Sequence, residues 1–196
     1  MIKFTVFFFS ILIILEYTTP LALPKCNGNY ENHCTGTVIH KNGEKYVGEI
    51  ENFQYHGKGS YLFLNGNTYV GDFKNGIQEG QGIFTYSNGD KYVGGFKKGL
   101  YHGKGKAIFS DGEMYEGDYI DDLPHGKGIQ TFVAGDQYTG EFVDGIRSGY
   151  GIFTFSNGDE YVGQFKNNMF NGNGTLKFSD GKTQEGVFVD HIFQNE

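Results

Sequence analysis

Four of the histidines in this 196-residue chain recur at one position of a regular spacing, which raises the question of metal binding. Because an imidazole nitrogen is a common ligand of zinc, a column of histidines at one repeat position suggests a metal site. Equivalent positions in neighbouring repeats of a β-sheet, however, lie about 10 Å apart, whereas zinc–nitrogen bonds measure about 2.1 Å. We therefore expect no metal site and no other cofactor at the four histidines of this column, His33, His56, His102 and His125.

Carboxylates form a second column, on the side of the chain opposite to its regularly spaced tyrosines. Two carboxyl groups can catalyse glycoside hydrolysis when they lie roughly 5–10 Å apart and one of them has a raised pKa. The repeat spacing makes these acids a stripe, although acids on neighbouring strands could approach more closely. We therefore expect no catalytic residue, and rank an enzyme last among the possible functions, for the column Glu49, Asp72, Asp118 and Glu141.

Both columns follow from a repeat of 23 residues, which is marked most clearly by tyrosine. A fixed period of this length is typical of a repeat architecture. We expect the tyrosines and the glycines that follow them by two positions to form the repeat scaffold. The tyrosines are Tyr46, Tyr69, Tyr92, Tyr115, Tyr138 and Tyr161, and the glycines are Gly48, Gly71, Gly94, Gly117, Gly140 and Gly163.

Each repeat contains two segments with the composition of short strands. Residues 69–73 alternate in polarity, and residues 82–86 are β-branched and aromatic, so both are predicted to be strands. Asn88-Gly89 leads into the next tyrosine and predicts a tight hairpin with a type I′ turn. The polar stretch from Lys74 to Gln81 is expected to be the longer connection within the repeat.

A two-stranded hairpin cannot bury its own apolar face, so neighbouring repeats must stack. The predicted fold is all-β, an elongated single-layer antiparallel sheet of stacked 23-residue hairpins, on the order of 60 Å long. Two aromatic columns run along this sheet. They either cover the backbone as its core or line a groove that binds a partner.

The pattern resembles the MORN (membrane occupation and recognition nexus) repeat family. The resemblance covers residues 34–190 and implies protein–protein contacts, often near membranes, and no inherited catalytic activity. Two features depart from the family pattern: the chain has no tryptophan, and Gln184 stands in place of the last tyrosine. The motifs that carry the resemblance are Tyr92-Val93-Gly94-Gly95-Phe96, His102-Gly103-Lys104-Gly105 and Asp111-Gly112.

The N-terminus is a separate segment. Residues 1–22 combine one early lysine with an apolar run from Phe4 to Leu15, as a secretory signal peptide does, although the cleavage site after Ala22 is weak. We expect an exported protein, periplasmic or secreted. The alternative is an uncleaved segment that anchors the chain to a membrane.

The only cysteines, Cys26 and Cys34, follow this segment closely. In an oxidising compartment such a pair is expected to form a disulfide, which would hold the N-terminal cap segment 23–33 against the first hairpin. The repeat array is expected to span residues 34–190, with a C-terminal tail at 191–196.

The net charge of the chain bears on which classes of partner it could bind. A formal charge of −7 and a pI near 5.3 argue against nucleic acid and against unspecific binding to anionic membranes. The expected function is a non-enzymatic scaffold that binds a protein partner or self-associates through its sheet ends. The alternative is association with a membrane surface, through Phe4–Leu15 if that segment is uncleaved.

Overall fold

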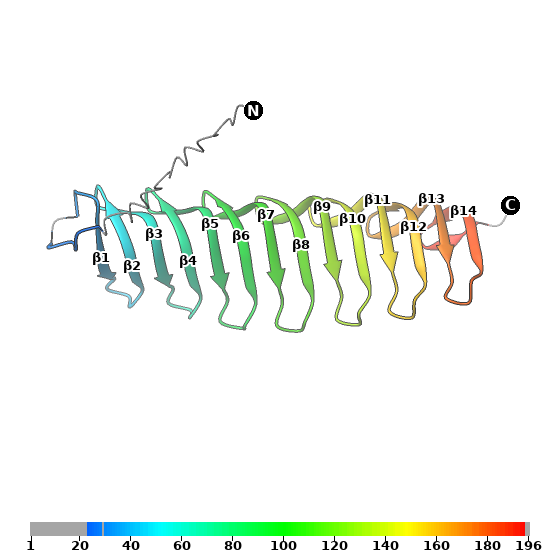
Figure 1. The fold of residues 1–196 in the computed structure, drawn as a ribbon, viewed down its shortest axis with the longest axis horizontal. Coiled ribbons are helices and arrows are strands. Elements are labelled where there is room, and N and C mark those ends of the chain that lie inside the picture. Colours follow the sequence, from blue (N-terminus) through cyan, green and yellow to red (C-terminus); the bar gives the residue numbers. More distant parts are fainter. Residues whose placement is uncertain (1–22, 29, 195–196) are drawn as a thin grey trace, which may run out of the picture.

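A computed structural model of the protein describes residues 23–28 and 30–194. The expected signal peptide, residues 1–22, lies outside the described residues. The described chain contains no helix and forms one antiparallel sheet in which every strand pairs with the next in sequence (Figure 1). The strands are β1 Cys34–Ile39, β2 Lys45–Glu51, β3 Gln54–Leu62, β4 Thr68–Lys74, β5 Ile77–Thr85, β6 Lys91–Lys97, β7 Leu100–Ile108, β8 Met114–Ile120, β9 Leu123–Thr131, β10 Gln137–Val143, β11 Ile146–Thr154, β12 Glu160–Lys166, β13 Met169–Lys177, β14 Thr183–Val189 and β15 Ile192–Phe193.

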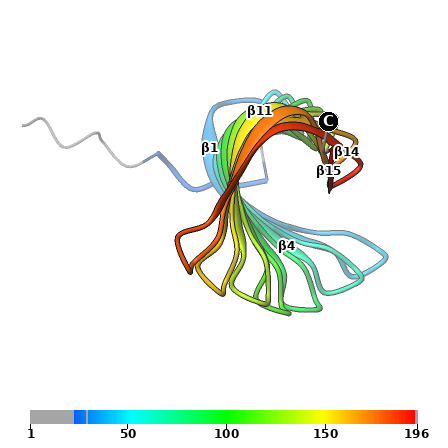
Figure 2. The same ribbon diagram turned by 90° about the vertical axis from the view of Figure 1, so that its right-hand side faces the viewer.

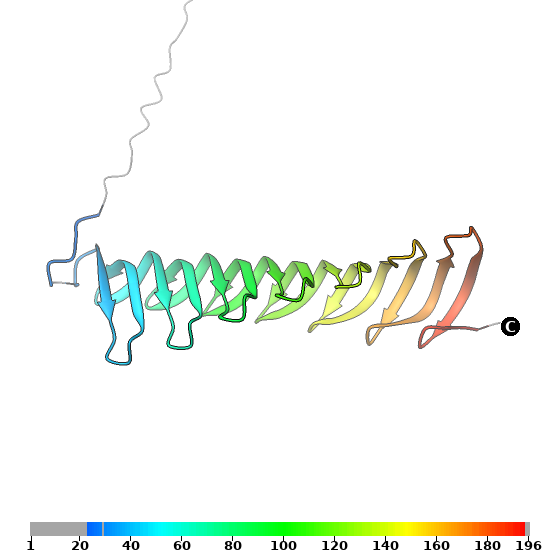
Figure 3. The same cartoon turned by 90° about the horizontal axis from the view of Figure 1, so that it is seen from below.

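The predicted fold class, a single-layer sheet of stacked hairpins, is confirmed. The strands lie side by side along one long axis (Figures 1 and 3). Viewed along that axis, the sheet curls into an arch (Figure 2). A single layer has no second layer to cover it, so the curl is what shields one face, called here the inner face.

The tight connection within each repeat is not where the sequence placed it. Residues 74–81 were predicted to be a loop, but β4 continues to Lys74 and β5 begins at Ile77. Only Asn75 and Gly76 lie between them, with φ angles of 51° and 82°. Positive φ at both central residues defines a type I′ turn, the geometry that matches the twist of paired strands.

The Asn-Gly position makes the longer connection instead, and the type I′ prediction there is wrong. At Asn88-Gly89 only the glycine has a positive φ, of 99°. The amide of Gly89 donates to the carbonyl of Tyr86, and the amide of Tyr86 donates to the carbonyl of Asp90. This pattern is a type I turn followed by a left-handed glycine. The Asn88 side chain stabilises it by accepting the amide of Asp90 at 3.1 Å.

A β-bulge bends the longer strand of each hairpin. In β4 and β5, Gly71 pairs with Gly82 and Phe73 pairs with Gln78, so three residues of β5 face one residue of β4. Gly80 lies in this bulge with a φ of 76°. Because bulges bend a strand and increase its twist, their recurrence in every hairpin explains the arch.

Glycine occupies the centre of every strand from β1 to β14, and these glycines pair with one another across the sheet. We call this line of residues the glycine row. Its members are Gly36, Gly48, Gly59, Gly71, Gly82, Gly94, Gly105, Gly117, Gly128, Gly140, Gly151, Gly163, Gly174 and Gly186.

The core lies on the inner face and consists of tyrosine rings laid across the glycine row. A Cβ on Gly82 would lie 2.5 Å from the ring of Tyr69, so only glycine leaves room for this ring. Tyr69 also contacts Phe73 of its own repeat and Phe96 of the next one edge to face, with ring centroids 5.0 and 4.9 Å apart. Edge-to-face contacts continue from ring to ring, an arrangement that aromatic pairs prefer. We call this ladder the aromatic spine: Tyr46, Phe73, Tyr69, Phe96, Tyr92, Tyr119, Tyr115, Phe142, Tyr138, Phe165, Tyr161 and Phe188.

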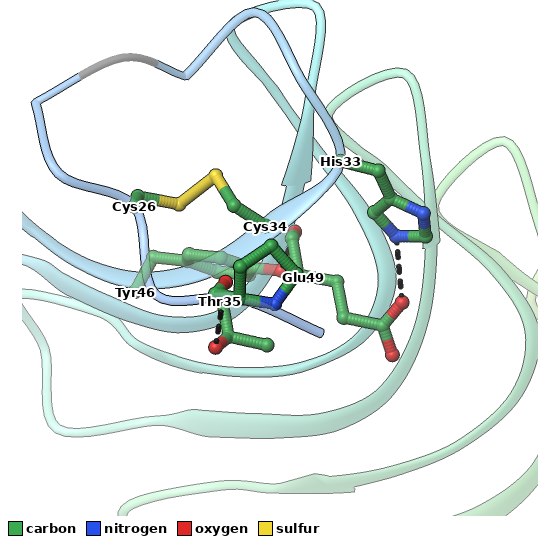
Figure 4. The surroundings of a disulfide bond; sticks show 7 residues. Cys26, His33, Cys34, Thr35, Tyr46 and Glu49 are labelled. Atoms are coloured by element: carbon green, nitrogen blue, oxygen red, sulfur yellow. Dashed lines mark hydrogen bonds and ion pairs between the residues drawn. A yellow bond between two sulfur atoms is a disulfide. The ribbon is translucent and has the colours of Figure 1, made fainter. Parts of the chain in front are cut away.

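The N-terminal cap segment covers the first edge of the sheet. Cys26 and Cys34 form the expected disulfide, which is confirmed (Figure 4). Next to it, the amide of Cys26 donates to the carbonyl of Thr35 at 2.9 Å. The backbone of this segment therefore satisfies part of an edge that would otherwise be open.

The C-terminal edge is covered over a shorter length. Ile192 and Phe193, within the expected tail 191–196, form β15 and pair with Val189 and Phe188. The ring of Phe193 lies 5.2 Å from that of Phe188 and so covers the last member of the aromatic spine. The remainder of β14 has no further paired strand among the described residues.

Candidate binding surface

The outer face, opposite the aromatic spine, carries a shallow groove along the array axis. One stretch of about 540 Å³ has Gly59, Gly71 and Gly82 in its floor, and a second of about 850 Å³ continues from Gly94 to Gly151. Gln81 and Val93 line both stretches, so they form one groove, called here the outer groove. Its floor is the backbone of the glycine row, whose Cβ positions face the tyrosine rings on the inner face.

One wall of the outer groove is formed mainly by β-branched residues. These residues directly follow the spine tyrosines or pair with such residues on the neighbouring strand, as Val70 pairs with Ile83. Val70 is 52% exposed and Ile129 is 42% exposed. Apolar residues that recur on a regular, exposed surface are typical of an interaction site. Lys106 and Glu116, which pair at 3.0 Å, interrupt these apolar residues between Val93 and Ile129. We call this wall the apolar row: Val47, Val70, Ile83, Val93, Ile129 and Ile152.

Of the carboxylate column, Glu141 lines the outer groove, and the other three members accept hydrogen bonds from amides of the bulges. Asp72 accepts the amide of Gln81 at 2.9 Å, and Glu49 accepts the amide of Lys58 at 3.0 Å. Asp118 accepts the amide of Lys127 and also pairs with Lys104 at 2.8 Å. The hydrogen bond from Lys104 lowers the pKa of the Asp118 carboxyl. Asp118 is therefore held as an ionised acceptor for the backbone.

The histidine column lies beside carboxylates. His102 and His125 each approach an aspartate of the following turn at 3.5 Å, Asp121 and Asp144 respectively. The ring centroids of His33 and His56 lie 6.2 Å apart, closer than the expected repeat spacing. Nε2 of His33 lies 2.9 Å from Oε2 of Glu49 (Figure 4). Among residues 23–28 and 30–194, no three histidine, cysteine or acidic side chains are grouped to hold a metal.

The scaffold tyrosines, Tyr46, Tyr69, Tyr92, Tyr115, Tyr138 and Tyr161, are all buried in the aromatic spine. Each hydroxyl donates to the carbonyl three residues later, as Tyr92 does to Gly95 at 2.9 Å. Burial raises the pKa of Tyr92 and Tyr161 to about 12. These phenols therefore stay protonated at neutral pH and act as hydrogen-bond donors to the sheet.

The outer groove itself was not anticipated from the sequence. The relevant signal was present: a β-branched residue follows most of the tyrosines, with its side chain on the opposite face. The sequence pattern favours the aromatic columns as a possible groove, but one of them is buried in the aromatic spine: Phe73, Phe96, Tyr119, Phe142, Phe165 and Phe188. The outer face carries further exposed apolar residues, such as Val70 and Ile129.

Two solved structures to which this chain is similar share little sequence identity with it. The TCP domain of SAS-4 (dCPAP) from Drosophila melanogaster, in complex with a proline-rich motif of Ana2 (dSTIL), has a TM-score of 0.46 and 13% identity, covering 79% of this chain and 90% of that chain. The TCP10 domain of Danio rerio CPAP has a TM-score of 0.31 and 12% identity, covering 80% and 88%. Because these TM-scores lie below 0.5, the similarities support no statement about function.

Sequence comparison is more specific. No curated protein matches the chain significantly. The family model of the MORN repeat matches six consecutive segments, residues 46–68, 69–91, 92–114, 115–137, 138–160 and 161–183. Each segment begins at a spine tyrosine and contains the type I′ turn, the bulge and the longer loop described above. The chain therefore belongs to the MORN-repeat family.

Proposed function

We propose that this protein is a non-enzymatic scaffold that binds a polypeptide segment of a partner protein along the outer groove. The observation that carries the proposal is the continuous groove with its apolar row, exposed over successive repeats. The acids that could suggest catalysis are engaged by bulge amides, which supports a structural role for them. The MORN repeats favour the same class of function.

The spacing of the groove restricts the form of its partner. Two strands per repeat advance the array by about 10 Å, so equivalent apolar residues recur at that distance. A helix covers this distance in about seven residues, at about 1.5 Å per residue. An extended chain covers it in about three residues, at about 3.3 Å per residue. We therefore expect a partner segment with apolar side chains at one of these two periods.

The test introduces two charges into the apolar row. Val47→Lys combined with Val70→Lys should reduce partner affinity at least roughly 10-fold, because neither position pairs with an acid across the sheet and the buried charges would find no partner on this chain. Partners would be isolated from an extract of the native host, and the affinity of the purified partner would then be measured. Since both residues are exposed, the variant should keep the thermal stability of the native protein.

Val133→Lys is the matched control. Val133 is 64% exposed and lies in the loop between β9 and β10, away from the groove. This variant should bind the partner as the native protein does. Equal affinity of the groove variant and the native protein would refute the proposal.

The sheet ends are the other surface suited to a protein partner. β15 covers only Phe188 and Val189 of β14, which leaves the edge of Thr183–Gly186 without a paired strand among the described residues. Open edges favour pairing with another chain. Self-association through this end stays a prediction.

We also propose that the protein acts outside the cytoplasm. The disulfide between Cys26 and Cys34 supports this, because such bonds persist in oxidising compartments. The apolar run Phe4–Leu15 has the composition of an export signal. If that segment stayed attached, it would anchor the array to a membrane, which is the second candidate role. The described residues include no helix with the length and hydropathy needed to cross a bilayer.

Intact mass of the protein from its native host tests the location. We expect loss of about the first 22 residues and two cysteines that resist alkylation under non-reducing conditions. A full-length mass with resistant cysteines would favour the membrane anchor instead. A full-length mass with two alkylated cysteines would contradict export.

A further inference from the structure

A pocket of about 380 Å³ opens on the inner face near the middle of the array. It exists because the repeat loses a bulky side chain there. Ala107 pairs with Tyr92, at a position where other repeats carry Tyr61, Phe84 and Phe153. The methyl group of alanine leaves the volume of an aromatic ring unfilled. We call this the inner pocket and define it by Tyr86, Tyr101, Ala107, Glu113, Pro124 and Gln130.

A second irregularity enlarges the same pocket. Two residues after the type I′ turn, most repeats place a side chain over the spine tyrosine. Tyr101 stacks on Tyr92 with ring centroids 3.6 Å apart, and Phe170 stacks on Tyr161 at 3.8 Å. The equivalent position over Tyr115 is Pro124, which has no aromatic ring to stack. Two departures from the repeat therefore coincide in one place.

The walls of the inner pocket are aromatic and carry polar groups. The hydroxyls of Tyr86 and Tyr101 are hydrogen bonded to each other at 2.6 Å. Gln130 donates to Oε1 of Glu113 at 2.6 Å. Tyr86 is 38% exposed, so this part of the wall is accessible from solvent. The hydroxyl groups of Tyr86 and Tyr101 therefore lie on the solvent-accessible side of the inner pocket, where a ligand would enter.

The charges that line the inner pocket are mostly negative. Asp90 and Glu113 belong to the longer loops, and Asp122 belongs to a type I′ turn, so acids flank both sides. Lys91 is the one basic residue among the lining side chains. Aromatic faces next to carboxylates attract cations, because the ring quadrupole and the negative charges act in the same direction.

The protein itself shows which cation suits this surface. Arg147 is its single arginine and lies one repeat after Pro124, at the equivalent position. Its guanidinium carbon lies over the rings of Phe132, Tyr138 and Phe153, at 5.1, 5.7 and 5.4 Å from their centroids. The inner face thus already holds one planar guanidinium against its aromatic residues.

We propose that the inner pocket binds the guanidinium group of an arginine side chain from a polypeptide partner. The cation would replace the missing aromatic ring beside Ala107 and pair with Glu113. Charge complementarity and the Arg147 example favour arginine over a neutral or anionic ligand. This site is on the face opposite the outer groove, so it stands independently of the function proposed above.

The test titrates the full-length chain with an end-blocked peptide, Gly-Gly-Arg-Gly-Gly, and follows backbone amide signals by NMR. We expect saturable shifts at Ala107, Glu113 and Gln130. The same peptide with citrulline, which is neutral and nearly the same shape, should give no saturable shift. Ala107→Phe should weaken binding at least roughly 10-fold because the ring fills the pocket.

Folding and charge controls accompany these measurements. Phenylalanine is native at the positions equivalent to Ala107, namely Phe84 and Phe153, so the variant should fold. Glu113→Gln should also weaken binding, by roughly 5-fold or more, whereas Glu116→Gln on the outer face should not. Equal binding of the citrulline peptide, or undiminished binding by both Ala107→Phe and Glu113→Gln, would overturn the proposal. Absence of saturable shifts with the arginine peptide would also overturn it.

Discussion

Replacement of Gly94 by alanine is expected to lower the free energy of unfolding by about 3 kcal/mol or more. A Cβ at this position would lie 2.5 Å from Cα of Gly105 and 2.6 Å from the carbonyl oxygen of Lys104. Both atoms belong to the backbone of the paired strand, so they can move only if the pairing of β6 with β7 is disturbed. Urea unfolding followed by circular dichroism would measure the change.

Gly112→Ala provides the comparison for this variant. Gly112 has a φ of 98°, but no atom lies within 4 Å of the added Cβ. The substitution therefore costs only the backbone strain of a left-handed residue, about 1–2 kcal/mol. If the two variants were destabilised equally, close approach of the strands would not explain the glycine row.

Replacement of Tyr138 by alanine is expected to have the second large effect, a loss of about 3–5 kcal/mol. Tyr138 is fully buried and contacts Phe142 and Phe165 at 5.1 and 4.7 Å. Each repeat of such an array contacts only its neighbours, so a gap in the aromatic spine should uncouple the two halves. We expect thermal unfolding to change from one transition to two, measured by calorimetry.

Tyr138→Phe distinguishes the contribution of the ring to stability from that of the hydroxyl group. This variant keeps the ring contacts and loses only the hydrogen bonds of the hydroxyl, to the carbonyl of Glu141 at 2.9 Å and to that of Ser148 at 3.4 Å. We expect a loss of about 1 kcal/mol and a single transition. One transition in Tyr138→Ala would show that the spine does not carry the coupling between repeats.

The repeat and its faces could be predicted from the sequence because both depend on local spacing. Alternate residues of a strand point to opposite faces, so Tyr92 and Gly94 share one face and Val93 takes the other. The fold class, the MORN family and the disulfide between Cys26 and Cys34 could be inferred from such local patterns. The two turn types could not be assigned in this way, because Asn-Gly occurs at both Asn75-Gly76 and Asn88-Gly89. The tertiary structure decided between them, since the bulge at Gly80 fixes the register in which the two strands pair.

The inner pocket and the outer groove could not be predicted from the sequence, because they depend on contacts between strands that residue spacing does not show. The inner pocket forms because Ala107 and Pro124, from different strands, leave space on the same side of the aromatic spine. The outer groove forms because the backbone of the glycine row lies between two rows of side chains. The amino-acid sequence by itself determined the repeat, its strands and its buried tyrosines, since these follow from residue type and period. Only the tertiary structure decided where the surface is hollow, because a hollow depends on which side chains from neighbouring repeats fail to meet.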